Sequence, residues 1–119
     1  MGLLSKLFGS KKDDKKGPPE QEVEVYFSYG STNFQHLYAL EDLIRHSIAD
    51  AAVGQYDGHI IATDGSDAHF YMYGPDAEAL FRVISPVLDS SSFMRGATVT
   101  LWFGPRRRRT PKRVIQLPS

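Results

Sequence analysis

Residues 56–89 constrain the fold most strongly, because signals for a strand, a turn, a strand and a helix follow one another there without a gap. Residues 59–63 and 69–73 are short runs rich in β-branched and aromatic side chains, and residues 64–67 (DGSD) separate them. Such an arrangement is typical of a β-hairpin. The GPD sequence at residues 74–76 then indicates a helix start, since proline suits the first turn and acids complement the helix dipole.

The side-chain alternation of this hairpin predicts its register. Phe70 and Met72 share one face of the second strand, and we expect Ile60 and Ala62 of the first strand to lie beside them under the helices. A slip of one residue would reverse every side chain. The expected pairing therefore requires an odd loop of three or five residues around Gly65, with a β-bulge.

The remaining periodicities complete the fold. Residues 22–29 and 97–103 alternate with period two, which indicates half-buried strands, and residues 114–117 can return as a fifth strand. Apolar residues recur at helical spacing in residues 34–51 and 77–88. The order β-α-β-β-α-β predicts an α+β, ferredoxin-like sandwich, with two helices on one face of an antiparallel sheet and the first and third strands in the centre. We expect these side chains to be buried together: Val25, Phe27, Leu40, Ile44, Phe70, Met72, Leu80, Ile84, Val99 and Leu101.

Charge divides the chain of 119 residues into three parts. Residues 1–19 hold five lysines and two aspartates (+3), and their composition predicts a flexible basic N-terminal segment and linker. Residues 105–119 hold six arginines and lysines without an acid (+6), whereas the residues between hold three arginines against twelve acids (−9). We interpret residues 20–119 as a single domain with an acidic body, a property that bears on partners rather than on fold.

Several classes of protein receive no support from the composition. The sequence has no cysteine, which excludes disulfides and thiolate metal sites. No apolar run reaches the roughly 20 residues of a membrane span, so we expect no transmembrane segment and a cytoplasmic protein. No nucleophile elbow, phosphate loop or recognised metal-ligand spacing is present, and we predict no catalytic residue, no cofactor and no metal.

The uncovered face of the predicted sheet is the main candidate site. Tyrosine and tryptophan supply large, rigid contact area, so a cluster of them on such a face favours a surface that binds a protein partner or a second copy. Ordinary cross-strand pairing is the alternative. The side chains that we assign to this partner-binding face are Tyr26, His59, His69, Tyr71, Tyr73, Trp102, Glu22 and Glu24.

Aromatic residues on the first and third strands also resemble, in topology, the RNA-recognition motif, which stacks bases there. The third strand lacks the basic-glycine-aromatic pattern of such modules, and Glu22 and Glu24 would repel phosphate. The basic loop of Arg106, Arg107, Arg108 and Arg109 can supply affinity for nucleic acid, and it can equally fold over the acidic body. Single-stranded nucleic-acid binding through the aromatic face and this loop is therefore the second hypothesis.

Aspartate and histidine also gather in the hairpin, at Asp57, His59, Asp64, Asp67 and His69. Two histidines on alternate strand positions could share a face and hold a metal or act as acid and base. Aspartates are, however, the residues that such turns require. A small enzyme or ligand-binding domain is the third hypothesis.

Three sequence blocks, YGSTNFQHLYALED, YDGHIIATDGSD and YMYGPDAEALF, resemble small bacterial proteins of uncharacterised function that share them. The resemblance covers about residues 26–103, and its blocks are scaffold motifs that carry over no catalytic residue. Proteins of this size and style are often immunity or regulatory proteins, so the resemblance implies such a role. Our leading hypothesis is a non-enzymatic protein-binding module, in its sharper form an immunity-type inhibitor whose acidic body covers a basic site on a toxin.

Overall fold

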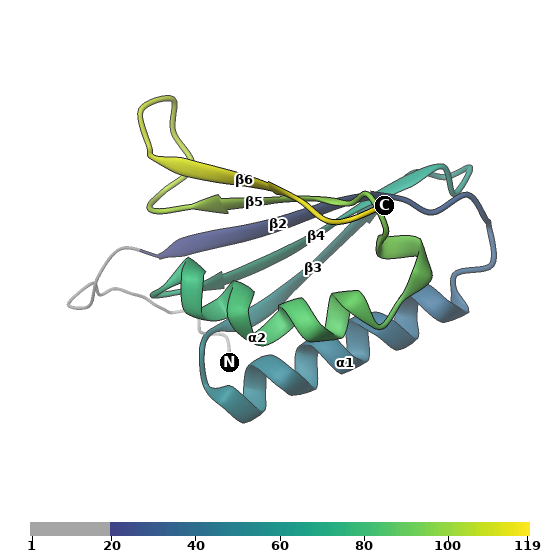
Figure 1. Cartoon of the computed structure of the whole chain (residues 1–119), viewed down its shortest axis with the longest axis horizontal. Coiled ribbons are helices and arrows are strands. Elements are labelled where there is room, and N and C mark those ends of the chain that lie inside the picture. The colour runs from purple at the N-terminus through teal and green to yellow at the C-terminus, as the bar shows by residue number, and fades with distance from the viewer. Residues whose placement is uncertain (1–19) are drawn as a thin grey trace, which may run out of the picture.

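The computed structural model describes residues 20–119, and the predicted basic segment of residues 1–19 lies outside them. The described chain is a five-stranded antiparallel sheet with both α-helices on one face (Figure 1). Its elements are β2 (Gln21–Ser28), α1 (Gln35–Ala51), β3 (Gln55–Ile61), β4 (Asp67–Gly74), α2 (Ala77–Asp89), the short 3-10 helix η1 (Ser92–Met94), β5 (Thr98–Trp102) and β6 (Lys112–Gln116).

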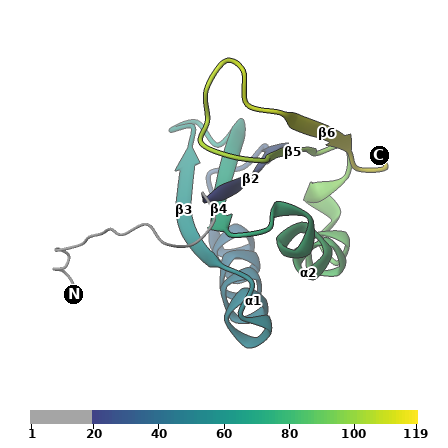
Figure 2. The same ribbon diagram turned by 90° about the vertical axis from the view of Figure 1, so that its left-hand side faces the viewer.

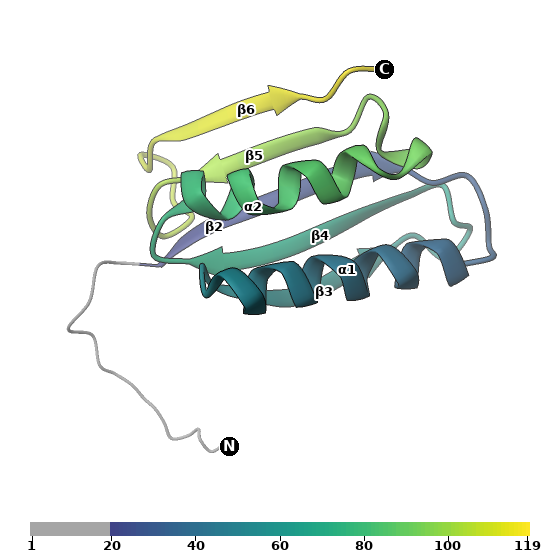
Figure 3. The ribbon, with the colours of Figure 1, turned by 60° about the horizontal axis from the view of Figure 1, so that its bottom comes forward.

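The strand order β3-β4-β2-β5-β6 is that of a ferredoxin-like sandwich with one added edge strand (Figure 3). The first and third strands of the chain, β2 and β4, are neighbours inside the sheet, as the sequence predicts. The fifth strand is confirmed as well, since β6 pairs with β5 in antiparallel register. No helix among residues 20–119 is long and apolar enough to cross a membrane.

The hydrophobic core lies between the helices and the sheet. All ten side chains that the sequence assigns to it are buried, with at most 2% of their surface exposed. The rings of Phe27 and Phe70 meet edge to face across β2 and β4, 4.9 Å apart. Because fully burying a side chain of this kind contributes about 1.5–3 kcal/mol, these residues dominate the stability of the fold.

The predicted register of the β3–β4 hairpin is wrong by one residue. His59 pairs with Phe70 and therefore lies on the helix side, whereas Ile60 pairs with His69 on the opposite face. The amide of Ala62 bonds to the carbonyl of Asp67 at 3.0 Å, which leaves an even loop of residues 63–66.

Two features explain this register. A Cβ at Gly65, where φ is +74°, would lie 1.9 Å from the carbonyl oxygen of Ser31, so the loop depends on glycine to close against the next turn. The bulge lies at the other end of the hairpin, between Tyr56 and Gly58. Because β3 is an edge strand that the helices cover only in part, its apolar alternation does not set the register.

Candidate functional site

The face of the sheet away from α1 and α2, here called the open face, is covered by no helix or strand of the described chain, although the loop between β5 and β6 rises on this side (Figure 2). Strand register arranges its side chains in rows that run across the sheet. One row contains Ile60, His69, Tyr26 and Thr98; the next contains Tyr71, Glu24, Thr100 and Val114; the third contains Tyr73, Glu22, Trp102 and Lys112.

Three neighbours in the first row, Ile60, His69 and Tyr26, form what we call the exposed row. Ile60 is 62% exposed and Tyr26 is 39% exposed. The rings of Tyr26 and His69 are 4.7 Å apart, and the hydroxyl of Tyr26 donates to Asp67 at 2.9 Å. This hydrogen bond to a carboxylate raises the pKa of Tyr26 above its usual value. A large aliphatic side chain and an aromatic ring thus face outward on either side of His69, near the end of the sheet formed by the β3–β4 loop.

His69 connects the exposed row to the middle of the open face. Its Nδ1 lies 2.8 Å from Oε2 of Glu24, so that the ring donates to the carboxylate. On the same strand the rings of His69 and Tyr71 are parallel, with centroids 5.9 Å apart. These contacts hold the imidazole in one orientation between its neighbours.

The third row is closed by the chain's own loop between β5 and β6. Arg106 donates to both carboxylate oxygens of Glu22, through Nη2 and, at 3.3 Å, through Nε, and it donates to Glu24 at 3.2 Å. The guanidinium also lies 4.8 Å from the ring centre of Trp102, and Lys112 lies 4.9 Å from the same ring. We call these five residues the arginine latch. The hydrogen bonds to Glu22 raise the pKa of Arg106 above its already high value, so its guanidinium stays positively charged.

The structure places most of the predicted site residues as expected and corrects three. Tyr26, His69, Tyr71, Tyr73 and Glu24 lie on the open face. His59 does not, because the hairpin register turns it toward α1. Glu22 lies on the open face but is only 5% exposed under Arg106, so it is not available to a partner. Trp102 is likewise on the open face but partly covered by Arg106 and Lys112.

The four arginines of the basic loop differ in their contacts. Arg106 folds onto the acidic body, which is one of the two arrangements that the sequence allows. Arg107, Arg108 and Arg109 are exposed and form no ion pair within residues 20–119. The loop therefore contributes one structural arginine and three accessible ones.

A second buried carboxylate, at the side of α1 that faces β3, was missed by the sequence analysis. Glu41 is 5% exposed and accepts hydrogen bonds from the hydroxyl of Tyr56 and from Nδ1 of His59, the latter at 2.7 Å. Burial, and then the bond to Glu41, raises the pKa of Tyr56 well above its ordinary range. The available signal was the helical spacing, because Glu41 lies within the buried stripe that contains Leu37 and Ile44.

The structure also decides whether the hairpin histidines can act together. His59 faces α1 and His69 faces the open side, so the two cannot share a metal or a substrate. Within residues 20–119 no three His, Asp or Glu side chains are close enough together to hold a metal ion. Hydrogen bonding by Ser66, through its side chain first and then through its backbone amide, lowers the pKa of Asp64 and accounts for an aspartate in the turn.

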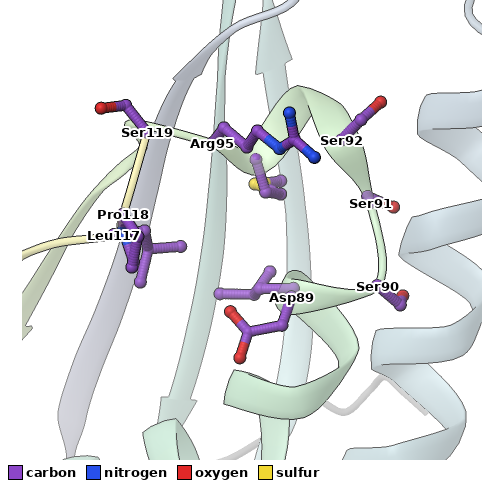
Figure 4. A pocket seen from close by; sticks show the side chains of 10 residues that line it. Asp89, Ser90, Ser91, Ser92, Arg95, Leu117, Pro118 and Ser119 are labelled. Carbon is purple, nitrogen blue, oxygen red and sulfur yellow. The ribbon is translucent and has the colours of Figure 1, made fainter.

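A hollow of about 550 Å³ lies at the end of the sheet opposite the arginine latch, between the end of α2, η1 and the end of β6 (Figure 4). Its polar lining consists of Ser90, Ser91, Ser92 and Ser119 together with one acid, Asp89, and one base, Arg95. No histidine lines it, so its serines lack the base that a nucleophilic serine requires.

The fold and this surface define a ferredoxin-like α+β domain with an open, partly latched sheet face. Comparisons of the chain with protein-family models, curated proteins and solved structures gave no match.

Proposed function

We propose that the protein is a non-enzymatic protein-binding module whose contact surface is centred on the exposed row. The observation that carries this proposal is Ile60, a large aliphatic side chain that is 62% exposed beside His69 and in the same row as Tyr26. Single exposed apolar residues are common, but an aliphatic and an aromatic residue in one row of the open face, with the imidazole of His69 between them, favour an interface centre. The three residues lie on paired strands and not on a loop, so less backbone has to be ordered on binding.

The charge of the body supports a basic partner and hence an immunity-type inhibitor. The body between the two basic ends carries a net charge of −9. Glu22 and Glu24 contribute less to this attraction than their two charges suggest, because the single guanidinium of Arg106 pairs with both of them. Asp67, which accepts a hydrogen bond from Tyr26, and Asp64 in the adjoining loop place further negative charge at this end of the face. Complementary charge there would speed association, while the apolar centre would hold the complex.

A second candidate, single-stranded nucleic-acid binding, is favoured by one specific observation. Glu22 and Glu24 were the main objection to it, and both are paired, with Arg106 and, for Glu24, also with His69. An electrophoretic shift with single-stranded RNA across a salt series tests this candidate. If it is correct, the shift weakens steeply with salt and is lost when Arg107, Arg108 and Arg109 are replaced by alanine.

The test of the protein-binding proposal uses one matched pair of variants. Ile60 and Val114 are both exposed aliphatic residues of the open face, 62% and 54% exposed, but Val114 lies on the opposite edge strand. A partner is first isolated on immobilised wild-type protein, and its affinity is then measured by calorimetry. Ile60→Ser should weaken binding by about 2 kcal/mol, as at other interface centres, whereas Val114→Ser should leave it unchanged. Equal binding by wild type and an Ile60→Ser/Tyr26→Ala variant would place the contact elsewhere.

A further inference from the structure

We propose that the loop between β5 and β6 forms a phosphate-binding site that is separate from the exposed row. A hollow of about 410 Å³ opens at this loop, which rises on the side of the sheet away from the helices (Figure 2). Its lining consists of Trp102, Arg106, Arg107, Arg108, Thr110 and Lys112. Four of these six side chains are cations, and none is an acid.

The hydrogen-bonding chemistry of the lining determines what can occupy it. Arginine, lysine and tryptophan side chains are donors only and have no acceptor. The one remaining polar side chain, Thr110, already donates its hydroxyl to the carbonyl of Pro105. An occupant must therefore bring several acceptors and negative charge.

The cations of this hollow differ in whether a carboxylate pairs with them. Arg106 is paired with Glu22 and Glu24, which fixes its guanidinium at one side of the hollow. Arg107, Arg108 and Lys112 have no acidic partner within salt-bridge distance among residues 20–119. The site thus combines one anchored guanidinium with three uncompensated charges.

This charge excess favours a phosphate group over a carboxylate. A carboxylate carries a single charge, whereas a phosphate group carries up to two charges and offers several oxygens to guanidinium donors. The ring of Trp102 already has cations 4.8 and 4.9 Å from its centre, so a nucleobase could stack there only by displacing them. We therefore assign recognition to the phosphate group itself and not to an attached base.

The position of Trp102 makes the site directly measurable. It is the only tryptophan of the chain, so its intrinsic fluorescence reports on this hollow alone. Pyrophosphate is the probe, titrated against the full-length protein by fluorescence and by calorimetry at low salt. Arg108 lines the hollow, while Arg109 carries the same charge on the same loop outside the lining. Arg108→Ala should weaken binding about tenfold, the loss of about one charge-assisted hydrogen bond, and Arg109→Ala less than twofold.

Two comparison ligands distinguish the alternatives. Succinate supplies two carboxylates, and a short single-stranded oligonucleotide supplies backbone phosphates. The site is supported if pyrophosphate binds more tightly than succinate and its binding depends on Arg108. If the oligonucleotide binds more tightly than pyrophosphate and also depends on Arg108, the phosphate belongs to a nucleic-acid backbone. Equal losses in Arg108→Ala and Arg109→Ala, equal binding of succinate, or no signal with any phosphate would overturn the proposal. Ile60→Ser should leave phosphate binding unchanged, so this proposal and the protein-binding proposal can fail independently.

Discussion

The exposed row and the arginine latch lie on the same sheet face and share strand β2, yet they differ in what covers them. In the exposed row, Ile60 and Tyr26 face outward. The hydroxyl of Tyr26 donates to Asp67, and the side chain of Ile60 has no polar group. In the latch, Glu22 is buried beneath a guanidinium that comes from 84 residues away. The alternation of β2 supplies both regions, so the strand pattern alone does not determine which part of the face remains accessible. We therefore expect substitutions in the latch to change stability and substitutions in the exposed row to change binding.

Phe70 sets the scale for this comparison, because it neighbours His69 on β4 but faces the helices and is fully buried. Phe70→Ala should lower the free energy of unfolding by about 3–5 kcal/mol, as at other buried phenylalanines. Urea denaturation followed by circular dichroism measures it. A loss below 1 kcal/mol would mean that the core collapses around the gap or that the ring is not buried.

Removing the latch arginine should have the next largest effect. Arg106→Ala leaves Glu22 buried without a cation, and we expect a loss of about 2–3 kcal/mol, somewhat below the range for fully buried pairs because Arg106 is 42% exposed. Arg109→Ala is the matched control and should change stability by less than about 0.5 kcal/mol. If the two variants have the same free energy of unfolding, the latch is a solvated ion pair that does not stabilise the fold.

Alkaline pH should destabilise the helix side more than the open face. The pKa of Tyr56 is raised from its ordinary value of 10 by burial and by its bond to Glu41. A folded-state pKa above the unfolded value gives stability that is present below pH 10 and is lost as the pH rises above it, since the unfolded state then releases its proton first. The free energy of unfolding should therefore fall above pH 10.

Two tyrosine variants separate the contributions to that loss. Tyr56→Phe should remove most of the alkaline decline while lowering stability at neutral pH, because Glu41 loses a hydrogen-bond donor. Tyr26→Phe should remove a smaller part of the decline, because the ring of Tyr26 is exposed although its bond to Asp67 also raises its pKa. Denaturation curves between pH 8 and about pH 11 test this, the range in which an ordinary tyrosine titrates. An unchanged slope in Tyr56→Phe would contradict the assignment.

The fold was predictable because its periodicities are local. The alternation of residues 22–29 and the helical stripe through Leu40 and Ile44 each place one apolar face, and the order of elements then leaves few topologies. The positions of Tyr26, Tyr71 and Trp102 on the open face follow from the same alternation. These parts of the prediction needed no long-range information.

The parts that could not be predicted depend on contacts between distant residues or on the edge of the sheet. His59 faces the helices because its edge strand takes its register from the loop at Gly65 and not from apolar alternation. The latch requires Arg106 to meet Glu22 across 84 residues, and nothing in either local sequence indicates the pair. Glu41 shows a related limit, because its buried bonds to Tyr56 and His59 follow from packing between α1 and β3.

The division between the exposed row and the latch is tested most directly by measuring two quantities on the same two variants. For Ile60→Ser and Arg106→Ala, the free energy of unfolding is obtained from urea denaturation and the affinity for the isolated partner from calorimetry. Ile60→Ser should change stability by less than about 0.5 kcal/mol, as an exposed site, and weaken binding by about 2 kcal/mol; Arg106→Ala should show the larger loss in stability. The account is contradicted if Ile60→Ser destabilises the fold as much as Arg106→Ala does, or leaves the affinity for the partner unchanged.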